Sequence, residues 1–262
     1  ITGWIAFTLA EVGYFSLWLL CGFLLAYSVI MVAMIFRATR FRCLAFPKPK
    51  LNVESVFLVV PIGLAACLFF HPSEAITCLD SGNLANSGAN IATTGSMFIH
   101  DSVLKDMSEE IRTTFYQVDL QQTHSYYGLQ FRGQGFYILD NTANEIAPQY
   151  LQMYPTWLAI FYSLFGFANG LFITCVFGLL SVLAVFLVVK TFWGLRTATI
   201  ASLLLTVCFL QIHFSRYPST EMLFQLLFFG GILSFAMFDK TSHRFFAITS
   251  ALCLGELLMV RL

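Results

Sequence analysis

Long runs of apolar residues, separated by shorter polar segments, dominate this sequence. They cover residues 4–36, 56–70, 150–165, 171–189, 198–212, 222–238 and 245–259. A helix that spans a bilayer needs about 20 mostly apolar residues. Charged residues make up 11% of the chain, against about 25% in a typical soluble domain. The sequence therefore predicts an all-α fold, a polytopic bundle of transmembrane helices.

Charge and cysteine content narrow the class further. The formal net charge is zero, which argues against a nucleic-acid partner. The seven cysteines form no CxxC pair and no Cys/His cluster with zinc spacing, so we expect neither a disulfide framework nor a structural metal. Because the chain begins at Ile1 and ends inside an apolar run, we expect it to be a fragment of a longer protein.

Lysine and arginine residues indicate the orientation in the membrane. Residues 37–50 contain five of them, and loops rich in Lys and Arg remain in the cytoplasm. The run at 56–70 then crosses outward, which places the polar residues 71–148 outside. This segment holds nine acidic and three basic residues. We therefore expect an integral membrane protein with a long extracytoplasmic loop, residues 71–168.

The run at 150–165 has two possible placements. It either crosses the membrane or lies along the outer interface as a juxtamembrane helix. Its Tyr, Trp and Gln content is typical of an interface, and this placement also puts Lys190, Arg196, Lys240 and Arg244 in the cytoplasm. We favour it, and it brings the segments around Asp80 and Arg216, together with Arg261, to the same outer face.

Asp80 opens the first polar constellation, in LDSGNLANSGANIATTGS. Apolar residues recur at helical spacing between Leu84 and Ala92, which predicts a short amphipathic helix along the membrane and a turn at Thr94–Gly95. Asp80 is either the cap of this helix or a catalytic carboxylate. No GxxxxGK pattern follows, so the glycines do not indicate a nucleotide site.

The second constellation is HFSRYPSTEMLFQ, residues 213–225. Arg216 is either an anchor whose charge reaches the headgroups or a ligand for an anion, of which a lipid phosphate is the obvious one. Glu221 is favourable near the start of the next helix. Asp80 and Glu221 are also a possible pair for a divalent metal, although no ligand set demands one.

His100 and Asp101 are adjacent in the outer segment, a pattern typical of a solvated turn. We keep both as candidate substrate-binding residues. No GxSxG motif is present, so a serine hydrolase is not indicated.

The segments EAITCLDSGNLANSGANIATTGS, APQYLQMYPTWLAIFYSLFG, FSRYPSTEMLFQLLFFGGIL and LGELLMVRL, in this order, resemble the GT-C superfamily of polytopic membrane glycosyltransferases. The chain is most similar to the protein O-mannosyltransferase-like branch, glycosyltransferase family 39. The resemblance implies that residues 55–262 are the N-terminal part of a GT-C-like catalytic module, preceded by residues 1–54, a transmembrane run and basic loop. It also implies juxtamembrane helices at 84–92 and 150–165.

The same resemblance implies an activity. A sugar would pass from a polyprenyl-phosphate donor to a hydroxyl of a protein, lipid or glycan, on the outer face of a bacterial or archaeal plasma membrane. Asp80 would be the general base, and Arg216 would stabilise the leaving phosphate, with Arg261 as a candidate second cation. The stretch with Tyr154 and Trp157 would shape either the sugar pocket or the lipid entrance. The residues point to no particular cofactor other than the possible divalent metal.

Two other functions fit the same chain. One is a transporter or flippase of lipid-linked sugars, although transporters often show inverted repeats and we find none. The other is a non-catalytic membrane scaffold whose outer loop binds a partner. Such a scaffold would need neither Asp80 nor Arg216.

Overall fold

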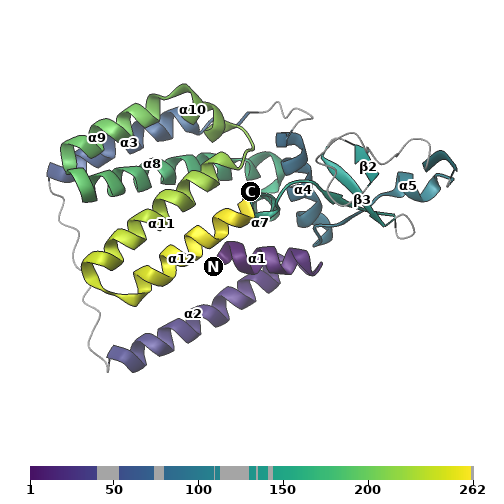
Figure 1. Ribbon diagram of the computed structural model, residues 1–262, viewed down its shortest axis with the longest axis horizontal. Coiled ribbons are helices and arrows are strands. Elements are labelled where there is room, and N and C mark those ends of the chain that lie inside the picture. The colour runs from purple at the N-terminus through teal and green to yellow at the C-terminus, as the bar shows by residue number, and fades with distance from the viewer. Residues whose placement is uncertain are drawn as a thin grey trace.

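The computed structural model describes residues 1–39, 53–73, 80–108, 110–112, 130–133, 135–140 and 144–260. These residues are predominantly helical (Figure 1). The helices are α1 (Thr2–Glu11), α2 (Leu17–Thr39), α3 (Val53–Phe69), α4 (Asp80–Thr94), α5 (Ser102–Asp106), α7 (Met153–Gly170), α8 (Phe172–Trp193), α9 (Leu195–Val207), α10 (Phe209–Arg216), α11 (Glu221–Thr241) and α12 (Arg244–Val260). The strands are β1 (Ile99–His100), β2 (Gln130–Gly133), β3 (Phe136–Asp140) and β4 (Glu145–Pro148).

Two of the described helices, α8 and α11, are long and apolar enough to cross a membrane. They correspond to the predicted runs 171–189 and 222–238. The sequence suggested a single apolar run at 198–212, but the structure divides it between two helices. Cys208 has extended backbone angles (φ −63°, ψ 125°), and α9 and α10 meet there at 62°. If this bent pair is one span, the described residues contain three candidate membrane-spanning segments.

The first apolar run also differs from the expectation. Residues 4–36 form parts of two separate helices, α1 and α2. The break falls at Gly13, whose φ of 77° lies in the left-handed region that favours glycine. Helix α1 packs on α7, and α2 leaves large apolar side chains exposed, with Trp18 89% exposed. Such a surface is typical of a lipid-facing helix.

The helices α3 and α8–α12 lie side by side, with α8 packed against α3, α9, α10 and α11 (Figure 1). A glycine permits the closest of these approaches. A Cβ atom on Gly178 of α8 would lie 2.3 Å from Ser215 Oγ of α10 and 3.3 Å from the ring of Phe69 in α3. The missing side chain therefore lets the ends of α3 and α10 meet over α8.

Helix α4 packs along α7 at one end of these helices. Its buried face includes Leu84 and Ile91, which confirms the predicted amphipathic helix. A Cβ atom on Gly88 would lie 2.7 Å from the Leu158 Cβ of α7, so the two helices are in close contact. Helix α4 ends at Thr94, and Gly95 follows with φ 79°, as the sequence predicted for this turn.

A four-stranded antiparallel sheet in the order β1-β4-β3-β2 lies beyond α4. Its Ile138 pairs with Ile146, and both pack on Leu104 of α5. The described residues are predominantly helical, in agreement with the all-α prediction. The sheet is an addition to it, in the segment that was interpreted as a loop with juxtamembrane helices. Its strands are two to five residues long, too short for a clear alternation of apolar and polar residues.

Candidate functional site

Asp80 is the first residue of α4, and its side chain is exposed. A carboxylate is favourable in the first turn of a helix, where the backbone N–H groups point outward. The hydroxyl of Tyr150 donates a hydrogen bond to Asp80 Oδ1, with the two oxygens 2.5 Å apart. Burial, and next the hydrogen bond to Asp80, raise the pKa of Tyr150 to about 12. The tyrosine therefore remains a proton donor to the carboxylate well above neutral pH.

Buried polar side chains surround this pair. Ser81 Oγ and Asn83 Nδ2, on the first turn of α4, have no hydrogen-bond partner among the described residues, nor does Gln152 Oε1 just before α7. Gly135, in the turn before β3, lies so close that a Cβ atom there would be 2.0 Å from Asn83 Nδ2. The Gly135 carbonyl accepts from Gln149 N at 2.8 Å. The sheet therefore closes over the start of α4 and positions the segment that carries Tyr150.

Arg216 ends α10 and reaches the last turn of α3. Its Nε donates to the carbonyl oxygen of Leu68 at 2.7 Å, and its Nη2 donates to the same oxygen. The Arg216 carbonyl in turn accepts from Ser73 N at 2.7 Å. The last carbonyls of a helix have no partner within the helix, so Arg216 supplies one and fixes the chain that leaves α3.

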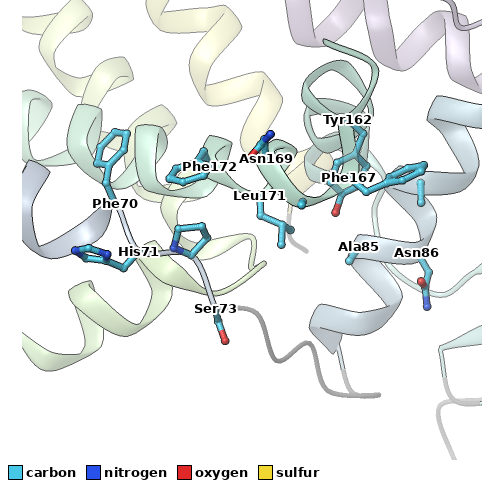
Figure 2. A pocket seen from close by; sticks show the side chains of 13 residues that line it. Phe70, His71, Ser73, Ala85, Asn86, Tyr162, Phe167, Asn169, Leu171 and Phe172 are labelled. Atoms are coloured by element: carbon cyan, nitrogen blue, oxygen red, sulfur yellow. The ribbon is translucent and has the colours of Figure 1, made fainter. Parts of the chain in front are cut away.

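A cavity of about 750 Å³ lies between the end of α3, the face of α4 and the corner between α7 and α8. Figure 2 shows His71 at one end of it and Asn86 at the other, with Leu171 between them. Gly166, with φ 79°, interrupts α7 beside the cavity. Apart from His71, the lining side chains are apolar or uncharged: Phe70, Pro72, Ser73, Ala85, Asn86, Ala89, Tyr162, Phe167, Ala168, Asn169, Leu171 and Phe172.

A smaller cavity of about 360 Å³ adjoins it. His71 and Ser73 line both, and the imidazole of His71 points away from Leu171 and Asn86 in Figure 2. The other lining residues of the smaller cavity are Phe209, Ile212, His213, Arg216 and Tyr217. Asp80 is not among the lining residues of either cavity. Helix α4, which begins at Asp80, lines the larger cavity through Ala85, Asn86 and Ala89, and Arg216 lines the smaller one. The two shared residues therefore lie between α4 and Arg216.

The structure places the other predicted site residues apart from these cavities. Tyr154 is fully buried, and its hydroxyl is 2.6 Å from Thr174 Oγ1. Asp101 caps α5 by accepting from Val103 N at 2.9 Å. His100 is exposed, with Nε2 3.8 Å from Glu145 Oε1. These positions suit packing, helix capping and a surface contact, and their predicted part in substrate binding stays a prediction.

Glu221 is the first residue of α11, where its charge suits the helix dipole. Arg261 lies outside the described residues. Within the part of the chain that the structure describes, no three His, Cys, Asp or Glu side chains gather in a way that could hold a metal ion. The possible sharing of a metal by Asp80 and Glu221 stays a prediction.

Sequence reasoning did not single out Tyr150, His71 or His213 as functional. Tyr150 was noted as an interface aromatic, but its partner lies 70 residues away in sequence, and no local pattern signals such a contact. No family model, curated protein or solved structure matches this chain.

Proposed function

We propose that this chain is a multi-pass, GT-C-like membrane glycosyltransferase that uses a polyprenyl-phosphate sugar as donor. The observation that carries the proposal is the Asp80–Tyr150 pair. The exposed carboxylate of Asp80, at the start of α4, accepts one hydrogen bond through Oδ1. Its Oδ2 has no hydrogen-bond partner among the described residues. A carboxylate held in this way is suited to accept a proton from a bound hydroxyl.

The proposed reaction is a single displacement. Asp80 takes the proton of the acceptor hydroxyl through Oδ2 while the acceptor oxygen bonds to the anomeric carbon. The bond from that carbon to the phosphate oxygen breaks, and its electron pair leaves with the phosphate. Configuration at the anomeric carbon inverts, because attack and departure occur on opposite sides. A general base contributes about 10²–10⁴-fold to such a rate.

The positive charge of Arg216 suits the leaving phosphate. Negative charge grows on the phosphate in the transition state, and fixed cations nearby lower its energy. Arg216 is held by Leu68, which orients its charge without the cost of ordering a flexible side chain. The acceptor is a hydroxyl of a protein, lipid or glycan, and Glu221 and Arg261 complete the proposed polar face.

In this proposal residues 71–168 lie outside the membrane and residues 37–50 in the cytoplasm. The orientation follows the excess of Lys and Arg in residues 37–50. Helices α4 and α7 then lie at the outer interface, at the depth of the donor phosphate, in a bacterial or archaeal plasma membrane.

A flippase for lipid-linked sugars is a second candidate, and one observation favours it. Transporters often contain broken helices beside their substrate, and α9 and α10 meet at 62° at Cys208, one short helix before Arg216. A flippase would move the lipid-linked sugar across the bilayer without forming a new glycosidic bond.

The test uses membranes that contain the protein and a radiolabelled polyprenyl-phosphate hexose. We expect transfer of label to an acceptor in the wild type and a loss of at least about 100-fold in Asp80→Asn. The control is Asp106→Asn, which changes an exposed aspartate on α5 and should transfer normally. Transfer by Asp80→Asn at the wild-type rate would remove Asp80 as the base. Label that crosses the bilayer without a new glycosidic bond would indicate the flippase.

A further inference from the structure

The smaller cavity differs from the larger one in charge. Three of its seven lining side chains, His71, His213 and Arg216, are cationic or become so on protonation, and none is acidic. In the larger cavity His71 is the one lining residue of this kind. A ligand with a negative group and an uncharged remainder would match the two cavities together.

Arg216 divides its donors between the Leu68 carbonyl and the cavity that it lines. An arginine binds a phosphate best through two parallel N–H groups. The edge formed by Nε and Nη2 is directed at the Leu68 carbonyl, which leaves the two Nη1 hydrogens and the second Nη2 hydrogen for another acceptor. Arg216 can therefore present its charge and its terminal edge to one or two phosphate oxygens, and the remaining oxygens need donors from elsewhere.

His213 lies beside Arg216 in the lining of this cavity, as an exposed side chain that stacks on two neighbouring rings. Its ring stacks on Tyr217, with centroids 5.5 Å apart and planes 23° apart, and on Phe209 at 6.1 Å and 18°. The stacking fixes the plane of the imidazole relative to the two neighbouring rings. His71 faces the same cavity from the end of α3, on the chain segment that Arg216 fixes through Ser73.

From this geometry we propose that the smaller cavity is a phosphate-binding subsite in which His71 and His213 donate hydrogen bonds to the phosphate oxygens. Arg216 adds its charge and its terminal N–H groups, and its contact with Leu68 holds the end of α3 in place. The uncharged remainder of the ligand extends past His71 into the larger cavity. The subsite deepens the proposed function, because it assigns binding of the donor phosphate to His71 and His213. Only the identity of the donor rests on the proposed glycosyltransferase function.

The phosphate could belong to a lipid or to a water-soluble ester, and binding measurements distinguish them. The full chain in detergent micelles is titrated with farnesyl phosphate, with farnesol and with inorganic phosphate. We expect farnesyl phosphate to bind at least about tenfold more tightly than farnesol, since hydrogen bonds to a charged group exceed neutral ones by that margin. Binding of inorganic phosphate at comparable strength would indicate a water-soluble source within the same subsite.

The variants are His71→Gln, His213→Gln and the double variant, with His243→Gln as the control. His243 is exposed in the turn between α11 and α12, so its loss should leave binding unchanged. Each cavity variant should weaken farnesyl phosphate binding by about tenfold or more and leave farnesol binding and the melting temperature as in the control. Equal binding of farnesyl phosphate by the double variant and the wild type would overturn the subsite.

The two proposals fail separately. If phosphate binding needs both histidines but Asp80→Asn transfers sugar normally, the catalytic assignment is wrong and the subsite stands. If sugar transfer needs Asp80 but the double histidine variant binds farnesyl phosphate normally, the subsite is wrong and the glycosyltransferase proposal stands.

Discussion

Tyr150 and Asp80 are joined by a 2.5 Å hydrogen bond across 70 residues of sequence. The tyrosine comes from the segment between β4 and α7, and the aspartate begins α4. The contact therefore fixes the candidate base relative to the α7 platform. It also leaves Oδ2 as the oxygen directed to a substrate, so the tyrosine is a positioning residue in the proposed reaction.

Replacing Tyr150 by Phe removes the hydroxyl and keeps the ring. We expect the maximal rate of sugar transfer to fall by about tenfold or more, because a base displaced from its productive geometry loses much of its effect. The apparent affinity for the donor should change little, since Tyr150 lines neither cavity. The control is Tyr14→Phe, which alters an exposed tyrosine. An unchanged maximal rate in Tyr150→Phe would contradict the positioning role.

Tyr150 also predicts a dependence of stability on alkaline pH. Its pKa is raised from 10.0 to about 12 in the folded protein, so folding favours the neutral phenol. The stabilisation is complete below pH 10 and is lost as the pH rises toward 12. Melting temperatures measured from pH 9 to 12 should therefore fall more steeply for the wild type than for Tyr150→Phe. Parallel curves would show that Tyr150 titrates as an ordinary tyrosine.

Arg216→Gln should destabilise the fold even without a ligand. The substitution removes the charged donors from the half-buried Leu68 carbonyl, and a hydrogen bond to a charged group contributes about 1.5–3 kcal/mol. The free energy of unfolding in detergent should fall by that amount. Arg196→Gln, at an exposed arginine near the start of α9, should change it by less than about 0.5 kcal/mol. If both variants unfold alike, the contact with Leu68 does not stabilise α3.

Asp101→Ala tests the predicted His100–Asp101 site. The carboxylate accepts hydrogen bonds from Val103 N and Leu104 N, and loss of such a cap costs about 0.5–2 kcal/mol. We expect a lower melting temperature with sugar transfer unchanged at temperatures below the melt. A fall in transfer by a fully folded Asp101→Ala would instead restore Asp101 as a substrate-binding residue.

Local features of the fold could be predicted because they depend on neighbours in sequence. The apolar runs indicated the long helices α8 and α11, since length and composition decide whether a segment suits a bilayer. The helix at Leu84–Ala92 and the turn at Gly95 followed from helical spacing and from the backbone freedom of glycine. Even the alternative interpretation of Asp80, as a residue of a helix start, was visible in the sequence.

Contacts between distant segments required the tertiary structure. Tyr150 and Asp80 lie 70 residues apart in sequence, and Arg216 and Leu68 lie 148 residues apart. His71 lines two cavities together with residues from other helices. No periodicity encodes them, because each depends on how the helices pack. The short strands of the sheet were missed for a related reason, since their pairing, such as Ile138 with Ile146, stabilises them more than their own sequence pattern does. The sequence by itself thus determined which segments form long apolar helices, and packing decided which side chains meet at the candidate site.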